Sequence, residues 1–77
     1  MSITIYTKET CPWCQKTKEF FKANKIKYTE KDVEKDPKAA KEMFELSGQP
    51  GVPVINLGDE VIVGYNEPAL KKALKIK

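Results

Sequence analysis

A short apolar run followed directly by a Cys-x-x-Cys motif constrains the fold of this chain more than any other feature. Residues 2–7 (SITIYT) alternate isoleucine with small polar residues, which predicts a β-strand. A helix follows, because Pro12 suits a first helical position, with Thr10 or Cys11 as its cap. We expect this helix to end near Asn24. One broad face of it carries Trp13, Cys14, Thr17, Phe20 and Phe21.

Two further helices are predicted by their caps and apolar spacing. Asp36 can cap a helix that has Pro37 in its first turn and ends at Gly48, where glycine takes the left-handed conformation. Residues 66–76 (NEPALKKALKI) form a last helix that starts at Pro68. The apolar faces carry Ala40, Met43, Phe44 and Ser47 in the first of these helices, and Ala69, Leu70, Ala73 and Leu74 in the second.

Three more strands complete the predicted order. Residues 26–33 form a strand diluted by charge, and residues 52–63 hold two β-branched runs joined by a hairpin at 57–60. The order is therefore β-α-β-α-β-β-α. The strand-helix-strand passage implies a parallel pair and the hairpin an antiparallel pair, so we expect a four-stranded mixed sheet with three helices on its two sides. This is an α/β fold, and the 77 residues make one domain, 1–77.

Composition excludes several classes of function. The chain has 14 lysines against 11 acidic residues, with no arginine and no histidine, and its lysines are not interleaved with aromatic residues. We therefore expect no nucleic-acid binding. Neither a secretory signal nor an apolar stretch of about 20 residues is present, so we expect a cytoplasmic protein that does not enter membranes. We also expect a monomer. A reducing cytoplasm disfavours a permanent structural disulfide.

The two cysteines, Cys11 and Cys14, have few structural uses. A disulfide between them closes so short a loop that it would contribute only about 2 kcal/mol before strain is subtracted. Zinc needs four sulfur or nitrogen ligands, and two thiols without histidine cannot supply them, so we expect no metal site and no tightly bound cofactor. Cys14 as a small core residue remains an alternative. A Cys-x-x-Cys motif between a strand and a helix favours redox chemistry.

The position of each cysteine predicts its role. Cys11 lies at the helix start, where free N–H groups and the helix dipole stabilise an anion, so we expect it to be the nucleophile. Cys14 lies one turn further along on the apolar face, where burial keeps a thiol neutral, so we expect it to resolve the mixed disulfide. Lys8 and Lys16 are the nearest cations in sequence, and either adds to thiolate stabilisation or is a solvated surface lysine.

The chain resembles the glutaredoxin family, within the thioredoxin fold, over nearly its whole length. Residues 6–14 (YTKETCPWC), 51–55 (GVPVI) and 63–70 (VGYNEPAL) carry the resemblance. It implies a thioredoxin-like fold, Cys11 as nucleophile and a cis peptide bond before Pro53. It also implies that the Val52 N–H and C=O are unpaired and face outward, so that an extended substrate segment can pair with them.

The resemblance further implies a set of positions that contact substrate or glutathione. They are Lys8, Pro12, Trp13, Gln49, Val52, Pro53, Gly64, Asn66 and Glu67. For Gln49 and Asn66, turn and helix-cap chemistry is an equal alternative, and for Trp13 a place at the edge of the core. The chain departs from the family pattern at Gly51, where threonine is usual, and at Tyr65 and Pro68, which replace glycine and aspartate of the glutathione-binding segment.

These observations predict a small dithiol thiol-disulfide oxidoreductase that reduces protein disulfides or glutathione mixed disulfides through Cys11 and Cys14. Its electron source is glutathione, as a co-substrate, or thioredoxin reductase. In the second case the chain is a redoxin that serves an enzyme such as ribonucleotide reductase. An alternative from another class is an iron–sulfur carrier, in which two protomers, or one with thiol cofactors, supply four sulfurs.

Overall fold

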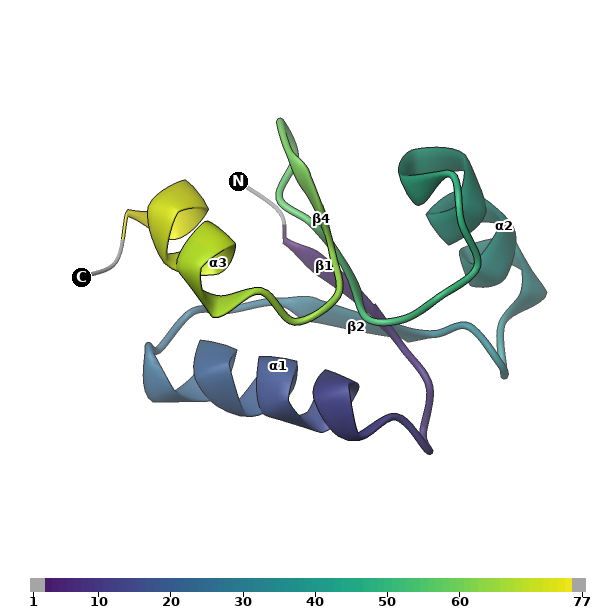
Figure 1. Cartoon of the computed structure of the whole chain (residues 1–77). Coiled ribbons are helices and arrows are strands. Elements are labelled where there is room, and N and C mark those ends of the chain that lie inside the picture. The colour runs from purple at the N-terminus through teal and green to yellow at the C-terminus, as the bar shows by residue number, and fades with distance from the viewer. Residues whose placement is uncertain (1–2, 76–77) are drawn as a thin grey trace.

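The computed structural model describes residues 3–75 as a sheet covered by helices (Figure 1). Residue 2 of the predicted first strand and residue 76 of the predicted last helix lie outside the described residues. The elements in chain order are β1 (Thr4–Thr7), α1 (Pro12–Ala23), β2 (Thr29–Asp32), α2 (Pro37–Ser47), β3 (Val54–Asn56), β4 (Val61–Val63) and α3 (Glu67–Leu74). The order predicted from the sequence is confirmed.

The four strands form one mixed sheet in the order β2-β1-β3-β4. β1 pairs with β2 in parallel, with Thr4 opposite Thr29, and it pairs with β3 antiparallel, with Ile5 opposite Ile55. β3 and β4 form the predicted hairpin, closed by a hydrogen bond from the Leu57 N–H to the Glu60 carbonyl at 2.8 Å. The parallel pair joined by α1 and the antiparallel pair joined by a tight turn are the two connections expected from the chain order.

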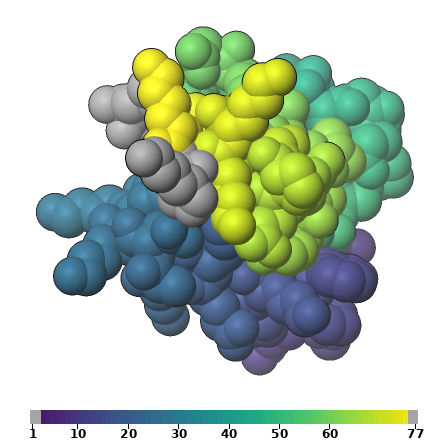
Figure 2. All heavy atoms as spheres, turned by 60° about the vertical axis from the view of Figure 1, so that its left-hand side comes forward, coloured from purple at the N-terminus to yellow at the C-terminus, as the bar shows by residue number. Residues whose placement is uncertain are grey.

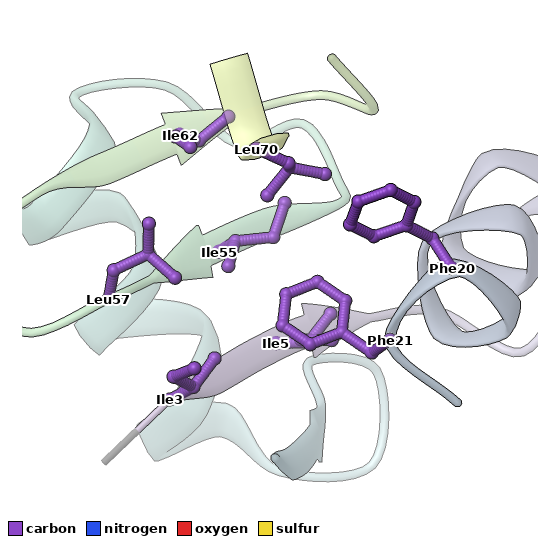
Figure 3. Close-up of a cluster of buried hydrophobic side chains, with 8 residues drawn as sticks. All are labelled: Ile3, Ile5, Phe20, Phe21, Ile55, Leu57, Ile62 and Leu70. Atoms are coloured by element: carbon purple, nitrogen blue, oxygen red, sulfur yellow. The ribbon is translucent and has the colours of Figure 1, made fainter. Parts of the chain in front are cut away.

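Two layers of side chains fill the space on either side of the sheet. The larger cluster lies between the sheet, α1 and α3 (Figure 3), and consists of Ile3, Ile5, Phe20, Phe21, Ile55, Leu57, Ile62 and Leu70. The smaller lies between the sheet and α2, and consists of Tyr6, Val33, Ala39, Met43 and Val54. In the space-filling view the yellow-green C-terminal segment meets the blue surface of the α1 region (Figure 2).

The second strand is shorter than the sequence predicts. It begins at Thr29 rather than at residue 26, because the chain folds back on the end of α1 first. Lys25 takes a positive φ of 56°, and the Ile26 N–H donates to the Phe21 carbonyl at 2.9 Å. Ile26 and Tyr28 still pack on the larger core cluster, so their apolar character serves packing rather than strand pairing.

The predicted apolar face of α2 is partly wrong. Ala39 and Met43 are the buried residues of this helix, whereas Phe44 is 53% exposed. At the helical repeat, Phe44 lies about 140° around the axis from Ala39, so it cannot face the sheet together with that residue. The caps agree with expectation: the Asp36 side chain accepts from the N–H groups of residues 38 and 39, and Gly48 has a φ of 72°.

Among residues 3–75, none of the helices has both the length and the apolar character that crossing a membrane requires.

Candidate active site

Cys11 is the N-cap of α1, and its sulfur accepts a hydrogen bond from the helix. The Cys14 N–H donates to Cys11 Sγ at 3.2 Å, and Pro12 occupies the first turn. The Cys11 N–H in turn donates to the Lys8 carbonyl at 3.1 Å, which ties the loop before the helix to its first residue. A sulfur at this position faces the N-terminal end of the helix and accepts from one of its free N–H groups.

Cys14 lies beside Cys11 but has no solvent exposure. Burial raises the pKa of the Cys14 thiol to about 12, and the hydrogen bond with Cys11 acts in the same direction. The Lys8 backbone and the positive charge of Lys18 act in the opposite direction. Both cysteines are free thiols in this structure, one half-buried and one buried. The two sulfurs are therefore neighbours in contrasting environments.

The Val52–Pro53 peptide bond is cis, as the resemblance implied. The Cys11 thiol lies 3.9 Å from the Val52 carbonyl oxygen, to which it donates. The expectation that this carbonyl is unpaired is therefore wrong, because the sulfur itself lies against it. The Pro53 carbonyl accepts from the Gly64 N–H at 2.8 Å, so the segment is fixed to the end of β4.

An apolar cavity of about 240 Å³ opens beside the cysteines, lined by Trp13, Val52, Pro53, Gly64 and Tyr65. The Trp13 and Tyr65 rings stack with centroids 6.1 Å apart and planes 21° apart. Trp13 is 54% exposed, which agrees with a position beside the site rather than in the core. The Lys16 Nζ lies over the Trp13 ring, 5.1 Å from its centre, in a cation–π contact.

Two of the predicted contact residues are used by the fold itself. The Gln49 side chain accepts from the Gly51 N–H at 2.6 Å and donates to the Gly51 carbonyl at 3.1 Å, which holds the turn before Val52. Asn66 is the N-cap of α3, where its Oδ1 accepts from the Ala69 N–H at 3.2 Å. The turn and cap alternatives describe both side chains.

Tyr65, which lines the cavity, interacts with Glu67 at the start of α3. Glu67 is paired with Lys71 at 3.0 Å. Partial burial raises the pKa of Tyr65, and the charge and hydrogen bonding of Glu67 add to this. The structure thus brings Pro12, Trp13, Val52, Pro53 and Gly64 around the cysteines, while Glu67 already has a cationic partner.

Sequence reasoning missed an ion pair on the opposite flank of α1. Lys18 Nζ lies 3.0 Å from a Glu30 carboxylate oxygen, and the buried Thr7 hydroxyl donates to the same oxygen at 2.8 Å. The signal available in the sequence was the spacing of Lys18, four residues after Cys14, which places both on one helix face. Its partner Glu30 lies in β2, and no local sequence pattern predicts that these two residues meet.

Among residues 3–75, no group of three or more histidine, cysteine or acidic side chains is arranged to hold a metal ion.

Comparison with known proteins gives a consistent result. A model of the glutaredoxin family matches residues 3–62. The glutaredoxin-like 8.6 kDa protein in the rubredoxin operon of Clostridium pasteurianum is 45% identical over 73 residues, which cover 95% of this chain and 97% of the relative.

Solved structures agree over almost the whole chain. The glutaredoxin from Archaeoglobus fulgidus superposes with a TM-score of 0.89 at 30% identity, covering 96% of this chain and 86% of the other. The glutaredoxin-like protein NrdH-redoxin from Escherichia coli superposes with a TM-score of 0.84 at 28% identity, covering 94% and 93%. With its four-stranded mixed sheet, three helices and two adjacent cysteines, the chain belongs to the glutaredoxin family and has the thioredoxin-like fold.

Proposed function

We propose that this protein is a dithiol thiol-disulfide oxidoreductase that uses Cys11 as nucleophile and Cys14 as resolving thiol. One observation carries the proposal: the Cys11 sulfur accepts the Cys14 N–H at the helix start, while the adjacent Cys14 thiol is fully buried. The first sulfur is held ready to attack from the surface. The second remains protonated, because burial raises its pKa to about 12, until a mixed disulfide forms beside it.

The reaction takes place in two exchanges. The Cys11 thiolate attacks one sulfur of a substrate disulfide, so that a bond from Cys11 to substrate forms and the other substrate sulfur leaves as a thiolate. Cys14 then loses its proton to solvent and attacks Cys11 Sγ, which forms the Cys11–Cys14 disulfide and releases the second substrate thiolate. The substrate gains two electrons and the protein loses two. A thiol or dithiol reductant returns the protein to its starting state.

The substrate surface favours a protein disulfide over glutathione. The cavity beside Cys11 is walled by the stacked Trp13 and Tyr65 rings, which offer flat apolar area. Gln49 and Asn66, two positions that match glutathione contacts in the family, are engaged in a turn and a helix cap. NrdH-redoxin of Escherichia coli, a structural relative, is described as having a thioredoxin-like activity profile. We therefore propose thioredoxin reductase as the electron donor.

Turnover assays test both parts of this proposal. The reduced protein is supplied with a protein disulfide or a glutathione mixed disulfide, and with electrons from thioredoxin reductase or from glutathione. We expect the protein disulfide and thioredoxin reductase to support the faster turnover. Cys11→Ser should lower turnover by about a thousandfold or more, because the nucleophile is lost. Undiminished turnover in Cys11→Ser would reject the nucleophile, and faster reduction by glutathione would reject the donor.

A further inference from the structure

The corner between α1 and β2 holds charged groups that the proposed reaction has not used. Cys14 must lose a proton before it can attack, yet it is fully buried and the chain contains no histidine to act as a base. A group that favours the Cys14 thiolate is therefore needed close to this sulfur. Lys18 is a charged side chain that acts on Cys14, and Glu30 is its ion-pair partner.

Lys18 is placed by the helix to act on Cys14. Residues four apart on a helix have Cβ atoms about 5–6 Å apart, and helical side chains lean back toward the N-terminus. The Lys18 side chain therefore lies over the turn that contains Cys14. Only 18% of it is exposed, and its Nζ is held 3.0 Å from the Glu30 carboxylate. The buried Thr7 hydroxyl donates to the same oxygen at 2.8 Å, which fixes Glu30 from a second side.

The titratable and charged groups around this corner come from three segments. α1 contributes Cys11 and Lys18, and the loop between β1 and α1 contributes Lys8 and Glu9. β2 and the turn after it contribute Glu30, Asp32 and Lys35. A cavity of about 400 Å³ at this corner is lined by Glu9, Gln15, Lys18, Glu30, Asp32 and Lys35. Because its lining is polar and includes Gln15 and Lys18, solvent reaches the helix turn that contains Cys14.

We propose that Lys18, held in place by Glu30 and Thr7, is a positioning residue that favours the Cys14 thiolate during the resolving exchange. This inference rests on the proposed dithiol function. In that exchange the Cys14 proton passes to water, and the Cys14–Cys11 bond forms as the bond from Cys11 to substrate breaks. The substrate thiolate leaves with the electron pair. Lys18 changes the free energy of the thiolate and does not itself take the proton.

The electrostatics of both partners agree with this assignment. The hydrogen bond with the Lys8 backbone and, to a smaller extent, the Lys18 charge lower the pKa of Cys14 against the larger effect of burial. Burial also raises the pKa of Glu30, but the hydrogen bonds from Lys18 and Thr7 outweigh it, so that the net pKa is below its usual range. A carboxylate held in its ionised form by two donors is a poor base, so the role falls to the ammonium group rather than to Glu30.

Dipyridyl disulfide separates the two exchanges in one experiment. This neutral probe releases one coloured thione when Cys11 attacks it and a second when Cys14 resolves the mixed disulfide, and its neutrality removes long-range steering by charge. We compare wild type with Lys18→Met, Lys18→Arg and Lys31→Met in stopped flow across pH 6–10. Lys31 is a matched control because it forms an ion pair of the same kind with Glu42, at 2.9 Å, between β2 and α2.

We expect Lys18→Met to slow the second release about threefold to tenfold near pH 7, with little change in the first, and to move its pH profile upward by up to about one unit. Lys18→Arg should restore the second release to within about twofold, and Lys31→Met should leave both unchanged. An unchanged second release in Lys18→Met, or equal slowing of both releases, overturns the inference. Slowing of the second release in Lys31→Met overturns it too.

The Glu30→Gln variant tests whether the Lys18 ammonium group or the Glu30 carboxylate assists the second release. The amide still accepts from Lys18 and Thr7 but carries no charge, so the second release should be equal to or faster than that of wild type. A slower second release would assign the role to Glu30 as proton acceptor and overturn that of Lys18. If wild type releases no second thione, the proposed function fails instead, because Cys14 then does not resolve.

Discussion

The two flanks of the α1 N-terminus are built from different kinds of side chain. On one flank, Trp13 stacks on Tyr65 over an apolar cavity lined by Val52 and Pro53. On the other, Lys18 is paired with Glu30 beside a polar cavity. Both flanks border the same helical turn, which carries one sulfur at its cap and the other inside.

This difference matches the two tasks that the proposed function assigns to the cysteines. Cys11 must meet a partner from outside, and flat aromatic area beside it supplies contact surface at low cost in side-chain entropy. Cys14 must change its protonation state in a buried place, and a fixed charge nearby changes the free energy of that step. The apolar flank therefore acts through packing and the polar flank through charge. Variants on the apolar flank should change stability and substrate binding, and variants on the polar flank should change the dependence on pH.

The largest expected effect is the loss of packing beneath the apolar flank. Phe20 is 9% exposed and meets Tyr65 edge-on at 6.3 Å. We expect Phe20→Ala to lower the free energy of unfolding by about 3 kcal/mol, through lost burial and the cavity left behind. Urea denaturation measures this. Phe44→Ala is the matched control, because Phe44 is 53% exposed, and it should cost under about 1 kcal/mol. Equal losses in the two variants would contradict the packing described here.

The next effect concerns pH and the buried thiol between the flanks. Burial raises the pKa of Cys14 to about 12, so its contribution to stability is complete below the unfolded value of about 8.5 and is lost as pH rises toward the folded value. From pH 8 to 10, the reduced wild type should lose about 1–2 kcal/mol relative to Cys14→Ala. Urea denaturation of both proteins under reducing conditions measures the difference, and parallel pH curves would contradict it.

A smaller effect, on substrate binding, should follow from removing the stacked Trp13–Tyr65 pair. Tyr65→Ala removes the partner of Trp13 and leaves a small residue where glutaredoxins have glycine. We expect KM for a protein disulfide to rise about threefold to tenfold, because an aromatic pair contributes about 0.5–1.5 kcal/mol. Turnover of a glutathione mixed disulfide should rise. Steady-state kinetics with both substrates measures the change, with Phe44→Ala again as control. A KM unchanged for both substrates would remove Tyr65 from the docking surface.

The smallest effect is on the stability supplied by the polar flank. The folded pKa of Glu30 is below its usual value of about 4.3. The contribution of this carboxylate to the free energy of unfolding is therefore present above that pH and is lost as pH falls through the folded pKa. Because 39% of this side chain is exposed, solvent screens the pair. We expect Glu30→Gln to cost under about 1 kcal/mol at pH 7 and less at pH 3. Urea denaturation at both pH values measures this, and a gap that widens in acid would contradict it.

Local sequence signals predicted much of the fold and half of the site. Pro12 predicted a helix capped by Thr10 or Cys11, and the structure shows Cys11 as the cap; Asp36 and Gly48 bounded the second helix. These signals succeed because capping depends on residues within one turn of each other. The apolar face of α2 was predicted less well, since Phe44 points away from the buried Ala39, and its burial depends on how the helix is rotated over the sheet.

What the sequence determined by itself is the place of each cysteine relative to its own helix: one sulfur at the cap and one a turn inside. Only the tertiary structure decided what surrounds them. Tyr65 meets Trp13 because β4 ends beside α1, and Glu30 meets Lys18 because β2 pairs with β1 in the observed register. Such contacts join residues far apart in the chain, and their geometry follows from strand order and packing rather than from local propensity.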